Sequence, residues 1–228
     1  MFRKSNKLEI WSQTSDGLSL SHTRSIYGRV TFLEKLRPAG ATTDYLFVGT
    51  DMYMYFTVFW DLGTKRLCTE KTYVDVADKT SRDSQTEDRC LIDPTQSFMA
   101  LLLYDGIVTI VPLSQGGKRK ALSGTGALGD PLPVRIEDQA VRSSTFLHSR
   151  AKDRNQVKLA FLFEDSHQKV CLSVRALDYT AGGSGDSGSA DLENKLGERN
   201  DLELGASHVI PVPAPACKFV ELMQFEAF

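Results

Sequence analysis

The sequence predicts an all-β protein, a partial β-propeller of the non-WD type. Apolar, β-branched segments occur in pairs around short polar turns, and the three strongest pairs turn near Asp51, Asp105 and Asp165. Their spacing of roughly fifty residues is typical of a propeller blade, which has four strands. No long segment shows the apolar period of a helix. A β-sandwich is the structural alternative, but its strands would follow at shorter and steadier spacing.

The clearest hairpin is Leu101–Leu113, with the sequence LLLYDGIVTIVPL. Asp105-Gly106 lies between its two apolar flanks, and these residue types accept the positive φ angles that a tight hairpin turn requires. Neither flank alternates between apolar and polar residues. We therefore expect both faces of this sheet to be covered by neighbouring sheets.

The chain opens with a predicted hairpin around Asp16-Gly17, which precedes the Asp51 hairpin by less than one blade. It is typical of the outer half of a blade whose inner half lies outside this chain. We thus predict about three whole four-stranded blades with partial blades at both ends. The predicted strand segments, in order, are 7–12, 18–26, 30–36, 45–49, 53–60, 72–76, 90–92, the two arms of 101–113, 134–136, 144–147, 157–163, 169–177 and 202–212.

Between the strands, three polar or Gly/Ser-rich segments are predicted to be exposed loops, at 78–88, 114–132 and 181–201. An unclosed propeller leaves unpaired backbone N–H and C=O groups at both ends of the arc. Each missing hydrogen bond costs on the order of 1 kcal/mol. We therefore expect these blades to be poorly stable alone.

Composition argues against several function classes. Of the 228 residues, 41% are hydrophobic and 25% charged, and the formal net charge of −2 gives no general attraction to nucleic acid or anionic membranes. No apolar run reaches the roughly 18–20 residues of a membrane helix, so no membrane association is predicted. The four cysteines form no CxxC pair, which favours reduced thiols in a nuclear or cytosolic protein: Cys68, Cys90, Cys171 and Cys217.

No catalytic, cofactor-binding or metal-binding residue is predicted, and no cofactor. The four histidines lie far apart, and no GxSxG motif is present. Asp51, Asp105 and Asp165 recur like catalytic carboxylates, but aspartate is a common turn residue. A base-stacking platform could form from aromatic residues that strand spacing more often places in a core: Trp11, Trp60, Tyr53 and Tyr55.

An ordered set of short segments resembles the first propeller of the large subunit of UV-damaged-DNA-binding protein, over about residues 6 to 215. That superfamily also includes the large subunit of the cleavage and polyadenylation specificity factor and a splicing factor 3b subunit. The Tyr-Asp-Gly hairpin followed by Val-Pro-Leu is closer to the damage-binding branch. The matching segments are Lys7–Trp11, Tyr27-Gly28, Leu36–Pro38, Asp44–Phe47, Ile92–Pro94 with the hairpin after it, Val134–Glu137 and Ala206–Pro215.

The resemblance implies a non-enzymatic scaffold in the nucleus, with the cytoplasm as a second compartment. The family's adaptor docks substrate-receptor proteins onto a cullin 4 RING ubiquitin ligase in DNA repair and protein ubiquitination. The cullin binds a second propeller that is absent here, and DNA is contacted only indirectly, although the family is associated with nucleic acid binding. Arg82 and Arg135 match family arginines on the receptor-docking face. A solvated surface charge is the alternative for each.

The resemblance also sets the expected domain organisation. Residues 1–228 form part of a first β-propeller, and residues 216–228 are a divergent C-terminal tail, as a truncation or a mispredicted exon boundary would produce. Two other functions remain open. One is a propeller subunit in pre-mRNA cleavage, polyadenylation or splicing. The other is a propeller enzyme, which ranks last because the sequence shows no set of polar residues that would converge on one site.

Overall fold

A computed structural model describes residues 6–37, 43–74, 83–84, 87–113, 128–138, 140–148, 156–182 and 188–213. Within these ranges the chain has fifteen β-strands and no helix, so the prediction of an all-β partial β-propeller is confirmed. The chain divides into two compact units. The N-terminal unit contains residues 1–79 and 114–128, and the C-terminal unit contains residues 80–113 and 129–228.

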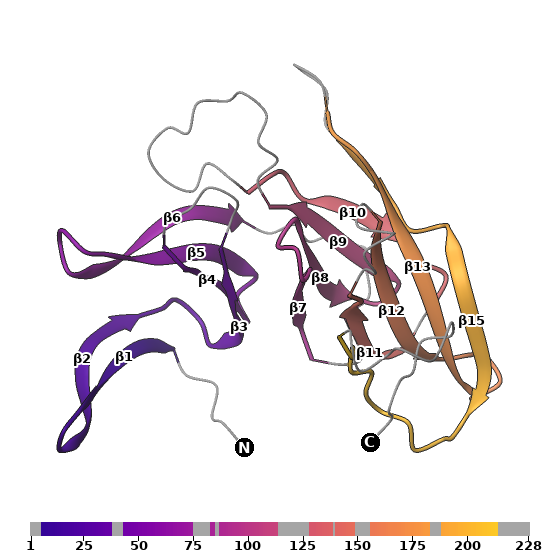
Figure 1. Ribbon diagram of the computed structural model, residues 1–228, viewed down its shortest axis with the longest axis horizontal. Coiled ribbons are helices and arrows are strands. Elements are labelled where there is room, and N and C mark those ends of the chain that lie inside the picture. Colours follow the sequence, from indigo (N-terminus) through magenta and orange to yellow (C-terminus); the bar gives the residue numbers. More distant parts are fainter. Residues whose placement is uncertain are drawn as a thin grey trace. The chain divides into compact units, whose positions relative to one another are not determined.

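The N-terminal unit has two antiparallel sheets (Figure 1). The first has two strands, as predicted for a partial blade, and the second has four strands in chain order. The two-stranded sheet consists of β1 (Lys7–Thr14) and β2 (Gly17–Ser25). The four-stranded sheet consists of β3 (Val30–Leu36), β4 (Tyr45–Thr50), β5 (Met54–Asp61) and β6 (Arg66–Val74).

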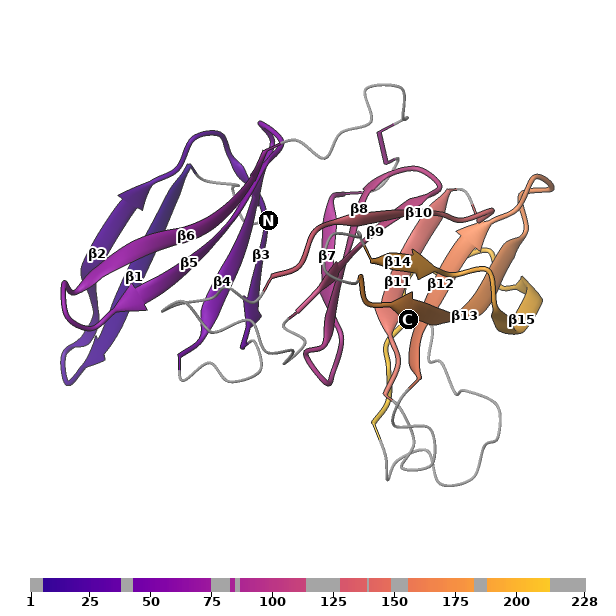
Figure 2. The ribbon, with the colours of Figure 1, turned by 90° about the horizontal axis from the view of Figure 1, so that it is seen from above.

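The two sheets of the N-terminal unit pack against each other (Figure 2). Side chains alternate between the two faces of a strand, so one face of each sheet points towards the other sheet. Leu8 and Ile26 therefore form a buried apolar cluster with Val48, Phe56 and Val58. At the edge of this cluster, Arg24 of β2 donates one hydrogen bond to the Leu67 carbonyl oxygen and another, at 2.7 Å, to Thr69 Oγ1 of β6. Apolar burial and these hydrogen bonds together join the half blade to the complete one.

The opposite face of the four-stranded sheet is aromatic, and it requires a glycine at position 49. The Phe32 ring stacks near the rings of Phe47 and Tyr55, with centroid separations of 5.8 and 5.9 Å. A Cβ atom on Gly49 would lie 2.8 Å from Phe32 Cε2 and nearer still to two other ring atoms. The ring therefore occupies the space that any other side chain would need.

Gly49→Ala is expected to lower the free energy of unfolding by about 1–3 kcal/mol, because the added methyl group displaces the buried ring. Urea denaturation followed by circular dichroism measures the change. Gly197→Ala is the matched control, since position 197 also lies in a strand and a Cβ there meets nothing within 4 Å. Equal losses in both variants would contradict this steric account.

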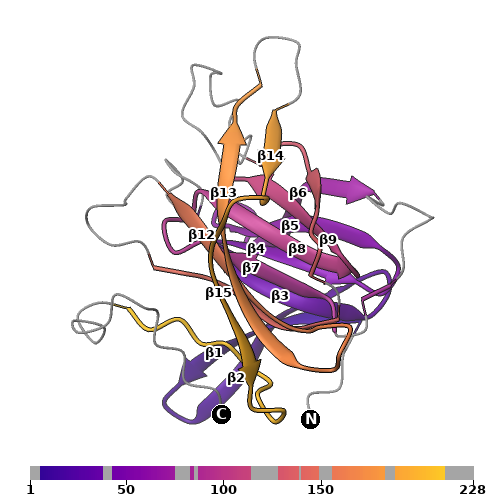
Figure 3. The same ribbon diagram turned by 90° about the vertical axis from the view of Figure 1, so that its right-hand side faces the viewer.

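The C-terminal unit also has two sheets (Figure 1). Its first sheet contains β7 (Arg89–Ile92), β8 (Phe98–Tyr104), β9 (Ile107–Pro112) and β10 (Leu132–Arg135), paired in chain order. Its second sheet contains β11 (Val141–Phe146), β12 (Val157–Glu164), β13 (Val170–Thr180), β14 (Ser189–Asp191) and β15 (Lys195–Leu202). Both β14 and β15 pair with β13, at its end and at its start respectively (Figure 3).

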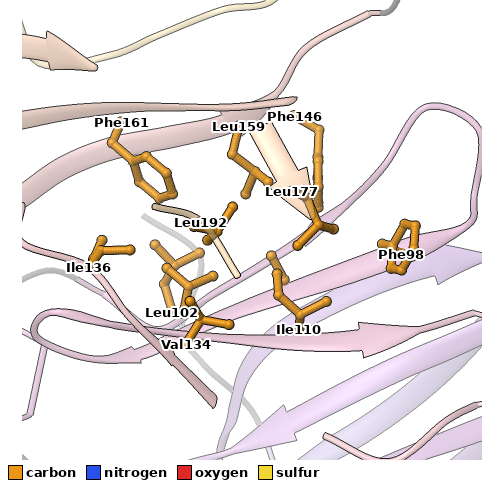
Figure 4. Close-up of a cluster of buried hydrophobic side chains, with 12 residues drawn as sticks. Phe98, Leu102, Ile110, Val134, Ile136, Phe146, Leu159, Phe161, Leu177 and Leu192 are labelled. Carbon is orange, nitrogen blue, oxygen red and sulfur yellow. The ribbon is translucent and has the colours of Figure 1, made fainter. Parts of the chain in front are cut away.

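The Asp105-Gly106 hairpin is the centre of this unit. All seven residues of β8 are buried, so the prediction that both faces of this sheet are covered is confirmed. Side chains from β8, β9 and β10 meet those of β11, β12 and β13 in one apolar cluster between the sheets (Figure 4). Phe161 of β12 and Ile110 of β9 are fully buried in it. The two sheets thus stack as neighbouring blades.

The other face of the second sheet is covered by the segment 203–213. Ala206 and Val209 pack on an apolar cluster of β12 and β13. Arg142 Nη1 donates to the carbonyl oxygens of Leu204 and Ala206 at 2.8 and 3.2 Å, and the Val209 N–H donates to Ser143 Oγ at 3.1 Å. A strand was predicted for 202–212, but residues 203–213 form no strand, and at Leu204, Ala206 and Val209 their backbone bonds to side chains of β11.

The prediction of an exposed loop across 181–201 is wrong, since β14 and all but the last residue of β15 lie within it. Leu192, between them, is only 1% exposed and belongs to the apolar cluster. Strand β13 is eleven residues long, and its backbone edge offers pairing to both segments. Strand β15 lies at the edge of the sheet, and most of its side chains are exposed. Its sequence therefore lacks the apolar alternation by which strands were predicted.

The other two predicted loops lie largely outside the described residues. In 114–132 the described part includes Leu132, which already belongs to β10. In 78–88 the described residues include Asp83, which forms an isolated bridge with Tyr104. The predicted C-terminal tail, 216–228, lies entirely outside them.

Candidate functional site

The candidate site is the end of the C-terminal unit at the β8–β9 turn. Arg135 is the last residue of β10, lies opposite Ile107 and is exposed. The Ile136 N–H donates to the Gly106 carbonyl oxygen at 2.9 Å, and the Ala140 N–H donates to Asp105 Oδ1 at 3.0 Å. The backbone that follows Arg135 is thus bound to the hairpin turn at Ile136 and at Ala140.

Arg82 lies outside the described residues, so the structure places only one of the two predicted docking residues. The segment that follows Arg82 is described at Asp83 and Ser84. Asp83 bridges to Tyr104, and the Ser84 N–H donates to the Leu103 carbonyl oxygen at 3.1 Å. The chain after Arg82 therefore runs beside the end of β8, next to the turn that Arg135 flanks.

A small hollow lies at this turn, lined by Arg89, Tyr104, Asp105 and Ile136 among others. Arg89 is half-buried, and its Nη2 donates to the Arg142 carbonyl oxygen at 2.6 Å. Burial lowers the pKa of Arg89, while the charge of Glu87 acts in the opposite direction. A guanidinium titrates so far above neutrality that Arg89 stays charged. Sequence reasoning missed Arg89, whose only signal was an arginine at the start of an apolar strand.

A buried ion pair fixes the connection that follows Arg135. Asp138 and Arg175 are each 3% exposed, and Asp138 Oδ2 lies 2.9 Å from both Nε and Nη2 of Arg175. Ser173 Oγ donates to the same oxygen at 2.8 Å, and Arg175 Nη1 donates to the Leu192 carbonyl oxygen at 3.0 Å. This network ties the β10–β11 connection to β13 and to the segment between β14 and β15. The network thereby anchors the backbone that follows Arg135 to the second sheet.

The three turn aspartates have structural roles. Asp51 accepts hydrogen bonds from the N–H and Nε of Arg29 at 2.7 and 2.9 Å, and the Arg29 side chain is the main reason that the pKa of Asp51 is lowered. Asp165 accepts from the backbone N–H groups of Lys169 and His167, and the Lys169 bond contributes most to lowering its pKa. Asp165 therefore stabilises its own turn, whereas Asp51 and Asp105 join their turns to Arg29 and to Ala140 in other connections.

The aromatic residues considered as a base-stacking platform do not form one. Tyr55 lies in strand β5 and is 2% exposed, whereas Tyr53 lies in the turn before that strand and is 44% exposed. Trp60 is partly buried, and its ring meets His22 edge-on at 5.5 Å. Trp11 is exposed on the two-stranded sheet.

Among the described residues, no group of His, Cys, Asp or Glu side chains has the arrangement of a metal site. Cys90 and Cys171 are buried, Cys68 is partly buried, and none of these three cysteines is in a disulfide. Burial is the main cause of a raised pKa for Cys171, which opposes formation of a reactive thiolate. No helix in the described part of the chain is long and apolar enough to cross a membrane.

Comparison with known proteins agrees with this architecture. The family model described as RSE1/DDB1/CPSF1 first beta-propeller matches residues 1–223, so it includes part of the tail predicted to diverge. "DNA damage-binding protein 1" of Schizosaccharomyces pombe is 30% identical over 172 residues, which are 75% of this chain and 16% of the relative. "DNA damage-binding protein 1a" of Arabidopsis thaliana and "DNA damage-binding protein 1" of Solanum lycopersicum are each 29% identical over 219 residues, 94% of this chain.

The chain spans 16–18% of the length of these relatives. The match nevertheless includes both units, the three hairpins and Arg135. Since the family model covers nearly the whole sequence, the chain belongs to the RSE1/DDB1/CPSF1 first beta-propeller family.

Proposed function

We propose that this chain is a non-enzymatic protein-interaction scaffold, part of an adaptor that docks substrate-receptor proteins onto a cullin 4 ubiquitin ligase. The family match over residues 1–223 is the main support. The relatives quoted above are named as DNA damage-binding proteins, which favours a role in DNA repair in the nucleus over one in RNA processing. The cullin binds a different part of the longer protein, and DNA is reached through partners.

The geometry favours binding over catalysis. The end of the C-terminal unit presents an exposed arginine, Arg135, on a backbone held by Gly106, Asp105 and the Asp138–Arg175 pair. A guanidinium has a planar donor fork that pairs with carboxylates and carbonyl oxygens of a partner, and arginine is enriched among residues that dominate interface energies. The turn carboxylates are occupied by backbone N–H groups, so they suit a rigid surface better than a reaction centre.

Charge reversal tests this assignment. Arg82→Glu and Arg135→Glu, made together, are expected to reduce co-precipitated receptor about tenfold, the size of effect that loss of an interface hot spot produces. Both the 228-residue chain and a chimera are tested, the chimera having residues 1–223 in place of the matching propeller of a full-length relative. Arg199→Glu, on the exposed edge strand β15, is the matched control.

Receptor binding that is unchanged in the chimera would refute the docking assignment. Mass spectrometry of the same purification tests the branch of the family. Cullin and receptor peptides are expected, whereas polyadenylation or splicing factors in their place would favour the RNA-processing function.

A further inference from the structure

Arg89 is a half-buried arginine that has no carboxylate in direct contact within the described part of the chain. It is the first residue of β7, and its Nη2 donates to the carbonyl oxygen of Arg142 on β11 at 2.6 Å. A guanidinium has five N–H donors. Those of Nε and Nη1 have no acceptor among the described residues, so they remain for a further partner.

The other two arginines of the described C-terminal unit that are not exposed each bond a carboxylate. Arg175 bonds Asp138 through Nε and Nη2 at 2.9 Å, and Arg142 bonds Glu164 through Nη2 at 2.5 Å. Removing a guanidinium from water costs free energy, which an opposite charge offsets. Arg89 has a neutral carbonyl oxygen in place of that opposite charge.

The carboxylates of this chain that lie near Arg89 do not take that position. Asp105 lines the same hollow, but its Oδ1 accepts from the Ala140 N–H at 3.0 Å, and no ion pair joins it to Arg89. Glu87 acts on the pKa of Arg89 through its charge, and burial has the larger, opposite effect. The position beside the guanidinium is therefore available to an acidic group from another molecule.

The small hollow at Arg89 limits the size of that group. Arg89 and the apolar residues Leu102, Ile136 and Val141 are among those that line it. Its volume is about 10 Å³, close to the least that holds one water molecule. It thus admits the end of a small polar side chain and excludes an aromatic ring. Apolar walls exclude water, and a charge pair is stronger where water is excluded.

The hollow adjoins the docking residue Arg135. Ile107, which lies opposite Arg135, lines the hollow, and so does Ile136, the residue after Arg135. In the four-stranded sheet Arg135 and Arg89 lie on the outermost strands, β10 and β7, at the end where the β8–β9 turn lies. A partner that covers this turn meets both cations.

We propose that the hollow at Arg89 receives the carboxylate of an aspartate or glutamate side chain of the docked receptor protein, so that Arg89 is a docking residue beside Arg135. This inference rests on the proposed function and names the chemistry of the partner at the same site. The planar guanidinium fork matches a carboxylate, and hydrogen bonds between charged groups are about twice as strong as those between neutral ones.

Neutralising Arg89 tests its part in affinity. The host is the chimera described above, and the probe is a receptor protein that co-precipitates with the full-length relative. Arg89→Met keeps a long side chain without the charge, and it is expected to weaken receptor binding about tenfold in isothermal titration calorimetry. Arg199→Met, on the exposed strand β15, is the matched control and is expected to leave affinity unchanged. Urea denaturation of both variants checks that the fold is kept.

Zero-length coupling tests the chemistry of the occupant, in a variant that keeps the positive charge. Arg89→Lys introduces an amine, which a water-soluble carbodiimide joins to an adjacent carboxylate as an amide, the carbodiimide taking up the water that is lost. With receptor bound, mass spectrometry is expected to find position 89 joined to an aspartate or glutamate of the receptor. Arg199→Lys is the matched control and is expected to give no such link.

The proposed function and this inference fail in different ways. If the unaltered chimera binds no receptor, the proposed function is refuted, and this inference with it. If receptor binds, this inference alone is overturned by either of two results. One is an affinity that Arg89→Met leaves unchanged, and the other is an amine at position 89 that couples to no carboxylate of the receptor.

Discussion

Asp138→Ala is expected to lower the free energy of unfolding by about 3–5 kcal/mol, the cost of leaving a buried charge without its partner. Arg175 is 3% exposed, and Asp138 Oδ2 is the oxygen that faces its Nε and Nη2 at 2.9 Å. Ser173 Oγ also loses its acceptor. Urea denaturation of the 228-residue chain measures the loss.

Two further variants make this expectation specific. Glu137→Ala removes the neighbouring ion pair between Glu137 and Lys195. Because the Glu137 side chain is 84% exposed, this change is expected to lower the free energy of unfolding by less than about 1 kcal/mol. The double variant Asp138→Leu with Arg175→Met is expected to be more stable than Asp138→Ala, because apolar side chains of similar volume can replace a buried ion pair. A double variant as unstable as Asp138→Ala would contradict the role assigned to charge burial.

Phe161→Ala is expected to cost about 3–5 kcal/mol, through lost burial and the cavity left between the two sheets of the C-terminal unit. Phe161 is fully buried and lies among Leu159, Leu192 and Ile136 in the cluster of Figure 4. Because both sheets contribute to this cluster, the change loosens their stacking as well as one strand. Thermal or urea unfolding followed by circular dichroism gives the value.

Graded substitution separates the cavity from a general loss of apolar area. Phe161→Leu keeps most of the volume and is expected to cost less than about 1.5 kcal/mol. Leu196→Ala removes a large apolar side chain that is 43% exposed on β15, and is expected to change stability little. A small effect of Phe161→Ala would mean that the two sheets do not depend on this cluster for their packing.

The candidate site was only partly predictable. The resemblance pointed to Arg135, and the structure places it, exposed, beside the Asp105 turn. Its supporting ion pair was missed, because Asp138 and Arg175 are 37 residues apart and each alone resembles a surface charge. One signal was available: Arg175 interrupts the apolar stretch Val170–Leu177, where an arginine needs a buried partner.

The hairpins at Asp51, Asp105 and Asp165 could be predicted from neighbouring residues, since a turn-forming residue between two β-branched flanks is a local pattern. Strand β15 could not be predicted in this way. Whether a polar segment such as 195–202 becomes a strand depends on the free edge of β13. Pairing between strands uses backbone N–H and C=O groups, which nearly every residue carries, and it joins residues far apart in the chain. The pattern of side chains therefore does not specify which strands pair.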